Sequence, residues 1–281
     1  MKAAAPSPAL SATTDPLDFS LADRLPTRTV GQGRLVIGAP PQDGRPGLLF
    51  VPGAYHGAWS YAHYLDYFAA AGLACAALDV RGHGALPQGP TFPSVTIADL
   101  GQDVADALDA LAAPTVVVGH SMGALPALLA ARQRQVAGVV LMAPSPPGDL
   151  PGALALPPVP PATPRAVPAA PEIRARFLAT APDRDVSAVT QRLCAESPQV
   201  LNDRYLLRVA IGAGAFNAPG LCLEAGLDTH DRHPPGQDQA IARRYGFSHA
   251  VLAEQPHCMM YADQWQVSAN AILAWHRSHF G

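Results

Sequence analysis

Short apolar segments alternate with segments of helical spacing along most of this chain. The clearest apolar segments are Leu48–Val51, Leu73–Val80, Val116–Val118 and Val136–Met142. The segments between them, residues 61–71, 96–111 and 122–132, are predicted helices. Continuous apolar strands are typical of parallel sheets that are buried on both faces. The alternation therefore predicts the α/β class, with βαβ units and a mostly parallel central sheet flanked by helices.

The alternation stops after Pro144 and resumes near residue 218. The run PPVPPATPRAVPAAP forbids long helices and sheet ladders, because proline lacks an amide donor. Helical spacing returns over residues 172–180, 186–195 and 200–210, so we read the interruption as a helical, proline-rich cap. We therefore expect a flexible N-terminal segment (1–18), a first core part (19–145), the cap (146–217) and a second core part (218–281).

The composition excludes several classes of partner. Hydrophobic residues make up 49% of the 281 residues and the formal net charge is −3, which does not favour nucleic acid or an acidic membrane surface. No apolar run reaches membrane-spanning length, and the N-terminus does not read as a signal peptide. The four cysteines show no regular spacing, which favours a reducing compartment. We expect a soluble cytoplasmic protein that acts on a small molecule; nothing in the sequence indicates an oligomeric state.

The stretch TVVVGHSMGA places a serine where a buried strand gives way to a helix. Serine is a common N-cap, but an N-cap does not need glycine two residues before and two residues after it. A strained turn does need small neighbours, which here are Gly119 and Gly123. The pattern therefore predicts a nucleophile elbow with Ser121 as the nucleophile.

Two backbone amides are candidate donors for an oxyanion hole. Ala54 follows the apolar strand that ends at Pro52-Gly53, and Met122 follows Ser121 at the start of a helix. Both lie at the carboxyl edge of the predicted sheet, where their N–H groups can point at one oxygen. Glycine at position 53 allows the backbone to come close.

A serine hydroxyl needs a base, and that base needs an orienting acid. His257 comes after the last predicted strand, where the base falls when the chain order is serine, acid, histidine. The acid should follow the strand at residues 221–225, where Asp228 and Asp231 compete. Asp228 is favoured because it is closer to the rigid end of the strand.

A metal site is the alternative interpretation of the same region. Asp228, His230, Asp231 and His233 resemble metal ligands, but no other group at ligand spacing supports them. We therefore predict no metal and no other cofactor.

Three segments together resemble the α/β-hydrolase superfamily, and in particular its lysophospholipase-like and esterase-like serine hydrolases. They are FVPGAYHGAWSYAHYLDYFAAAGLACAALDVRGHG, VVVGHSMGA and QPHCMM. The resemblance covers about residues 45–145 and 218–281, but not the cap. It implies the α/β-hydrolase fold, a Ser121–His257–Asp228 triad, and Ala54 and Met122 as oxyanion donors. The chain departs from the family by having Pro52-Gly53 where His-Gly is usual, and by a longer loop after Asp228.

These features predict a serine hydrolase that cleaves a carboxylic ester or thioester through an acyl-enzyme. The few charges of the cap favour an acyl or aromatic substrate, and Tyr55 and His56 are candidates for contacting it. The alternative is a non-hydrolytic enzyme on the same scaffold, such as a lyase, an acyltransferase or a cyclase. A binding protein without catalysis is disfavoured, because all three triad residue types are present.

Overall fold

One sheet organises the protein. The computed structural model describes residues 15–41, 44–214 and 216–281, and within these ranges eight strands pair in the order β1-β2-β4-β3-β5-β6-β7-β8. The strands are β1 (Thr27–Val30), β2 (Gly33–Ala39), β3 (Gly47–Val51), β4 (Cys75–Asp79), β5 (Thr115–His120), β6 (Gly138–Met142), β7 (Gly220–Ala225) and β8 (Ser248–Leu252). β2 runs antiparallel to β1 and β4, and all other pairs are parallel. The predicted mostly parallel sheet is confirmed.

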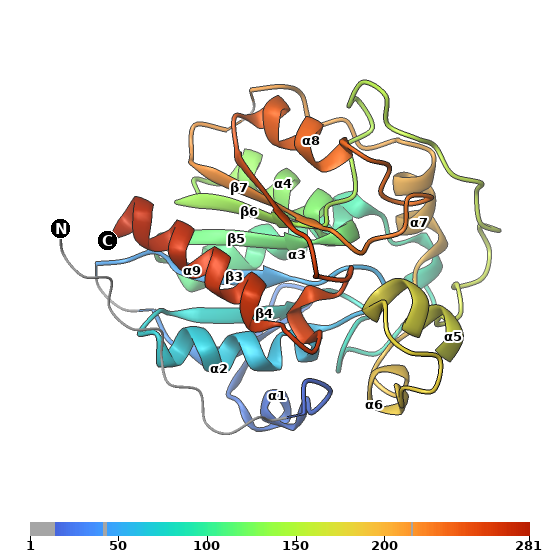
Figure 1. Ribbon diagram of the computed structural model, residues 1–281, viewed down its shortest axis with the longest axis horizontal. Coiled ribbons are helices and arrows are strands. Elements are labelled where there is room, and N and C mark those ends of the chain that lie inside the picture. The colour runs from blue at the N-terminus through green and yellow to red at the C-terminus, as the bar shows by residue number, and fades with distance from the viewer. Residues whose placement is uncertain (1–14, 42–43, 215) are drawn as a thin grey trace.

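Helices cover both faces of the sheet (Figure 1). One face is covered by α1 (Ser20–Arg24), α2 (Ala62–Ala70) and α9 (Gln266–Phe280). The other face is covered by α3 (Ile97–Leu111), α4 (Ala124–Gln133) and α8 (Gln237–Tyr245). Single 3₁₀ turns span Ala58–Tyr61, Phe92–Ser94, Ser121–Gly123 and Met259–Tyr261. The helix α1 was not predicted from the sequence, since its five residues are too short to show helical spacing.

The continuous apolar strands divide their side chains between two cores. Successive side chains of a strand point to opposite faces, so Leu48 and Phe50 of β3 enter one core and Leu49 and Val51 the other. The first core is rich in aromatic residues; the Phe50 and Tyr61 rings, for example, stack 4.9 Å apart. Burial on both faces explains why these strands show no polar alternation.

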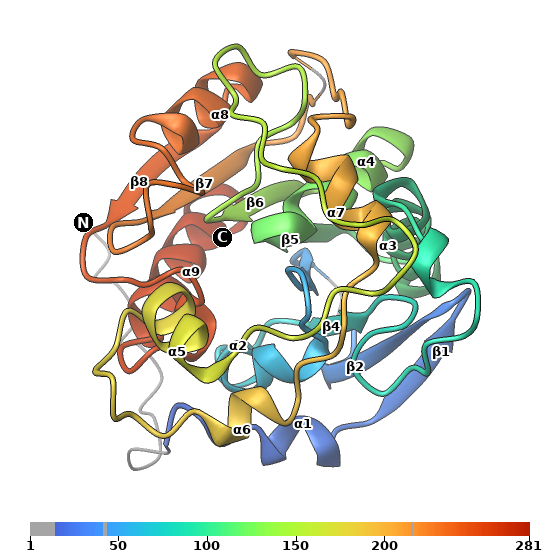
Figure 2. The ribbon, with the colours of Figure 1, turned by 90° about the vertical axis from the view of Figure 1, so that its right-hand side faces the viewer.

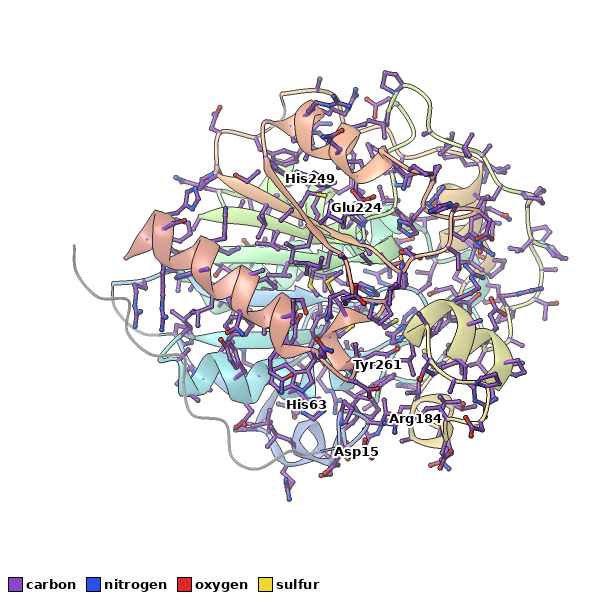
Figure 3. The ribbon with its side chains drawn as sticks, in the orientation of Figure 1. Asp15, His63, Arg184, Glu224, His249 and Tyr261 are labelled. Atoms are coloured by element: carbon purple, nitrogen blue, oxygen red, sulfur yellow. The ribbon has the colours of Figure 1, made fainter. Side chains whose placement is uncertain are left out.

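The edge strand β8 is only partly buried. On β8, the last strand of the sheet, His249 lies 2.9 Å from Glu224 of β7 (Figure 3). The predicted N-terminal segment 1–18 lies outside the described residues except for 15–18, where Leu17 is buried. No helix in the described part of the chain has the length and apolar character needed to cross a membrane.

Residues 143–219, here called the β6–β7 segment, contain α5 (Ala170–Glu172), a π-helical turn (Ile173–Leu178), α6 (Ser187–Thr190) and α7 (Pro198–Tyr205). They lie together at one end of the sheet, and Figure 2 views the molecule from that end. Two predicted helices are shorter than expected. α6 covers only part of 186–195. Val189 and Leu193 are both buried, although the helix ends at Thr190, so the apolar spacing here reflects burial and not a continuous helix.

The second shortened helix, α7, ends at Tyr205 although helical spacing continues to residue 210. Leu207 has a φ of +55°, which breaks the helix. The amides of Ile211 and Gly212 then donate to the carboxylate of Asp149 at 3.1 and 2.9 Å. Tertiary hydrogen bonds thus replace the helical ones that the local sequence favours.

Candidate active site

Ser121 occupies a strained turn between β5 and α4. Its φ is +52°, a left-handed conformation that is rare outside glycine. A Cβ on Gly119 would lie 2.7 Å from the Cα of Ala124, and one on Gly123 would overlap the carbonyl oxygen of Pro52. The two glycines are therefore needed because the backbones of the turn, of α4 and of the loop after β3 meet here.

His257 joins Ser121 to Asp228. The Nε2 of His257 lies 2.9 Å from the Ser121 hydroxyl oxygen, and its Nδ1 lies 2.5 Å from the Oδ2 of Asp228. Asp228 follows β7 and His257 follows β8, so the ends of three parallel strands bring the residues together. Asp231 was the competing acid, but its side chain is 68% exposed and its nearest charged partner is Arg232.

The Asp228 carboxylate is held in its ionised form. Burial opposes ionisation, but the charge of His257 and its hydrogen bond outweigh that effect and lower the pKa of Asp228 to about 2. An ionised Asp228 accepts a hydrogen bond from the Nδ1–H group of His257, which leaves Nε2 free to accept one from the Ser121 hydroxyl.

A second histidine approaches the same carboxylate. The Nε2 of His233 lies 3.5 Å from the Oδ2 of Asp228, and the His233 and His257 rings are 4.9 Å apart. The ligand atoms of Asp228, His233 and His257 lie within 4.8 Å of one another, a spacing that a metal ion could use. Asp228 and His257 are already hydrogen-bonded to each other, so a metal would compete with the link to Ser121. His230 and Asp231, the other candidate ligands from the sequence, do not belong to this group.

The loop after β3 brings Ala54 beside the serine. Ala54 and Met122 line the same pocket as Ser121. The Nδ1 of His56 lies 2.7 Å from the Ala54 carbonyl oxygen and its Nε2 lies 2.7 Å from the Tyr261 hydroxyl. Burial lowers the pKa of His56 to about 4, so the ring is neutral and can donate to Ala54 while accepting from Tyr261. His56 thus braces a loop that has Pro52 where the family usually has histidine.

Tyr55 is fixed by a residue that the sequence did not single out. It has a φ of +69°, and its amide donates to Glu196 Oε2 at 3.0 Å. Glu196 belongs to the β6–β7 segment, is fully buried, and also accepts from the Nε2 of His83 at 3.0 Å. Only the tertiary structure brings these three residues together, because they are far apart in the chain.

His120 makes a contact that its position in the sequence did not reveal. Its side chain is buried and its Nε2 donates to the backbone carbonyl of His257 at 2.9 Å. The contact holds the loop that carries His257 against the end of β5.

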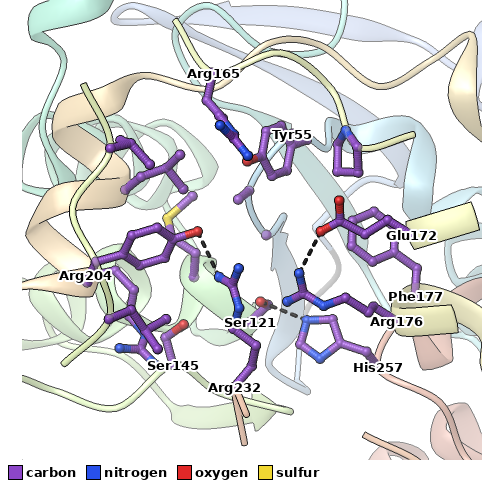
Figure 4. A pocket seen from close by; sticks show the side chains of 18 of the residues that line it. Tyr55, Ser121, Ser145, Arg165, Glu172, Arg176, Phe177, Arg204, Arg232 and His257 are labelled. Atoms are coloured by element: carbon purple, nitrogen blue, oxygen red, sulfur yellow. Dashed lines mark hydrogen bonds and ion pairs between the residues drawn. The ribbon is translucent and has the colours of Figure 1, made fainter. Parts of the chain in front are cut away.

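The pocket above Ser121 has a volume of about 690 Å³. Its wall includes apolar residues of the β6–β7 segment such as Leu156, Val159 and Phe177. It also includes four arginines, three of them from this segment, whose few charges did not lead us to expect them. They are Arg165, Arg176, Arg204 and Arg232, labelled in Figure 4 around Ser121 and His257.

Comparison with known proteins agrees with this architecture. A search of curated protein sequences finds no match. Among solved structures, the methylesterase protein MES16 from Arabidopsis has a TM-score of 0.64 at 18% identity, covering 82% of this chain and 98% of its own. The esterase EaEST from Exiguobacterium antarcticum has a TM-score of 0.65 at 13% identity, covering 90% and 99%. Tomato methylketone synthase I, solved with 2-tridecanone, has a TM-score of 0.64 at 16% identity, covering 84% and 99%.

The sequence profile of the alpha/beta hydrolase family matches residues 48–271, which is most of the chain. The match includes the strands that carry Ser121, Asp228 and His257 and the β6–β7 segment between them. On this match, and on the strand order, the chain belongs to the alpha/beta hydrolase family.

Proposed function

We propose that the protein is a serine esterase that hydrolyses a carboxylic ester or thioester through an acyl-enzyme. The observation that carries the proposal is His257, which lies within hydrogen-bond distance of both Ser121 and Asp228. This is the arrangement in which a histidine base activates a serine and a carboxylate orients the base. Family membership and the esterases among the structural neighbours also support a hydrolase.

In the proposed reaction, Ser121 attacks the ester carbonyl while His257 takes its proton. The amides of Ala54 and Met122 stabilise the oxyanion of the tetrahedral intermediate. His257 then returns the proton to the departing alcohol or thiol, which leaves the acyl group on Ser121. Water, deprotonated by His257, attacks the acyl-enzyme and releases the acid and the free serine.

The remaining parts of the proposal concern the β6–β7 segment and the substrate. We assign the segment the role of a cap, since its residues line the pocket above Ser121. A small acyl or aromatic ester is the substrate class that the pocket volume and its apolar wall support. No specific observation within the described residues favours the lyase, acyltransferase or cyclase alternative.

The test is labelling with a fluorophosphonate probe, followed by intact mass, alongside hydrolysis of short-chain nitrophenyl esters. We expect one adduct on the parent protein and none on Ser121→Ala, with kcat for ester hydrolysis reduced at least about 10³-fold. Ser145→Ala is the matched control, because Ser145 is another serine in the pocket wall and should not be needed for labelling. Labelling that persists in Ser121→Ala would contradict the proposal, and labelling without ester turnover would favour a non-hydrolytic reaction.

A further inference from the structure

Arg204 is a buried cation without a partner in the described part of the chain. Its side chain comes from the last turn of α7, and the residue is only 6% exposed. No described residue forms a hydrogen bond or an ion pair with its guanidinium, and its Nη1 is fully enclosed. Burial lowers the pKa of Arg204 to about 10, which still leaves it charged at neutral pH. Buried charges are normally paired, so an unpaired one calls for an explanation.

The other charged groups of the pocket are already engaged or hydrated. Arg176 lies 2.6 Å from Glu172, and Arg232 donates to the Tyr205 hydroxyl at 2.8 Å. Arg165 is exposed, so water can solvate it.

Asp228 is bound to His257, and Asp231 is exposed beside Arg232. Thus no carboxylate among the described residues of the pocket wall is placed to neutralise Arg204, although Arg204 lines the same pocket as Ser121.

The place of Arg204 in the pocket wall sets where a compensating charge would lie. Arg204 is on the wall opposite Arg176 and His257, with Ser121 between them (Figure 4). A ligand that contacts both Ser121 and Arg204 must therefore cross the pocket. Leu156, Val159 and Leu201, which also line the pocket, suit an apolar chain along that path. One buried guanidinium is balanced by one negative charge, and its planar fork matches the two oxygens of a carboxylate.

We propose that the pocket selects esters that carry a carboxylate at the end of an apolar chain, and that Arg204 binds this carboxylate. The inference rests on the proposed function and narrows its substrate class from esters in general to monoanionic ones. The helix dipole of α7 offers a purely structural account, because its negative end also favours a cation in the last turn. A structural role and a substrate-binding role predict different behaviour of Arg204 variants.

The first measurement is equilibrium binding to the full-length Ser121→Ala protein, in which a bound ester is not consumed. Monomethyl adipate and dimethyl adipate differ only in whether the distal carboxyl is free or methylated. We expect the monoanion to bind at least about tenfold more tightly, as for a hydrogen-bonded charge pair. Arg204→Met in the same background should abolish this preference, and Arg204→Lys should retain part of it. Arg208→Met, the control, removes an exposed arginine that does not line the pocket and should keep the preference.

A second ester places the carboxylate on the alcohol side. 6-Acetoxyhexanoate carries it there, whereas monomethyl adipate carries it on the acyl side, and each is compared with its methyl-capped form. A preference for either anion supports the proposal and shows which side of the ester faces Arg204. Equal binding of both anions and their capped forms would overturn it, as would a preference that survives Arg204→Met.

Hydrolysis and thermal unfolding complete the test. With otherwise parent protein, Arg204→Met should raise KM for the anionic ester about tenfold or more relative to its effect on KM for the neutral ester. Its Tm should not fall, because the variant removes an unpaired buried charge; a lower Tm with equal losses on both esters would establish the structural role instead. If Ser121 is not labelled by the fluorophosphonate but the binding preference holds, the proposed function fails while the carboxylate site stands.

Discussion

Positions 119 and 123 require glycine because backbone atoms of neighbouring segments occupy the space that a side chain would need. Each is packed against a neighbouring segment, and a side chain at either position would meet main-chain atoms rather than a flexible side chain. Ser121 itself takes a left-handed conformation between them. The strain is local, and the surrounding sheet and helix hold it in place.

Replacing Gly123 by alanine should damage both stability and activity. The added Cβ would overlap the Pro52 carbonyl oxygen, so the turn that carries Ser121 and the loop that carries Ala54 would have to separate. We expect a loss of about 1–3 kcal/mol in the free energy of unfolding and a more than tenfold fall in ester hydrolysis. Denaturant unfolding and steady-state kinetics would measure the two effects. Gly89→Ala is the control, because a Cβ there meets nothing within 4 Å; equal behaviour of the two variants would show that packing at Gly123 is unimportant.

One buried carboxylate, that of Glu196, links the β6–β7 segment to two loops of the core. Glu196 accepts hydrogen bonds from the amide of Tyr55, from the Nε2 of His83 and from its neighbour Ser197. Tyr55 follows β3 and His83 follows β4, so a single side chain joins three segments at the carboxyl end of the sheet. The same contact fixes the loop that presents Ala54 to the pocket.

This attachment should depend on pH through His83. Burial disfavours a charged His83, but the charge of Glu196 and its hydrogen bond outweigh that and raise the pKa of His83 above its usual 6.5. A raised native pKa stabilises the fold fully below the unfolded pKa of about 6.5, and this contribution is lost as pH rises through the native value.

Glu196→Gln should therefore lower the free energy of unfolding by about 1–3 kcal/mol near pH 6. Between pH 6 and pH 9 this free energy should fall less in the variant than in the parent. Urea unfolding at several pH values would measure both effects. Glu224→Gln, which removes the more exposed partner of His249, is the control and should change stability little. A parent-like pH profile in Glu196→Gln would rule out the proposed coupling.

Each face of the sheet carries its own hydrophobic core, and the cysteines are distributed through both. Cys75 and Cys258 are in the core that contains α2 and α9, while Cys222 is in the core that contains α3 and α8. Cys194 is half-buried in the β6–β7 segment, and all four cysteines are free thiols. Burial raises the pKa of Cys75 and of Cys194 to about 12, so neither forms much thiolate at neutral pH.

Thiol reactivity should consequently report unfolding of the whole molecule. At about pH 8 we expect a disulfide reagent to react very slowly with the native protein and quickly with all four thiols in guanidinium chloride. Absorbance of the released thiolate measures both rates. If one thiol of the native protein reacts quickly and this reaction is lost in Cys194→Ser, the β6–β7 segment opens locally. Fast native reaction of two or more thiols would contradict the burial of the cores.

Much of the fold follows from local patterns. Apolar runs and helical spacing predicted the strands β3 to β7 and the helices α2, α3 and α4, because strand and helix periodicity are set by neighbouring residues. The family match and the strand order confirm the α/β-hydrolase fold. The shortened helices α6 and α7 are different, since burial and the hydrogen bonds of Asp149 override their local preference.

The site divides in the same way. Ser121 was identifiable because its glycine neighbours are adjacent in sequence, and His257 because chain order limits where a base can fall. The choice between Asp228 and Asp231 needed the structure. The two residues are only three positions apart in one loop, and the path of that loop decides which carboxylate reaches His257.

Glu196, His120 and Arg204 could not be singled out from the sequence, because the groups that surround them are distant in the chain. Sequence alone determined the fold and the candidate nucleophile, because local patterns encode both. Only tertiary packing decided which charges are buried together and which buried charge has no partner among the described residues.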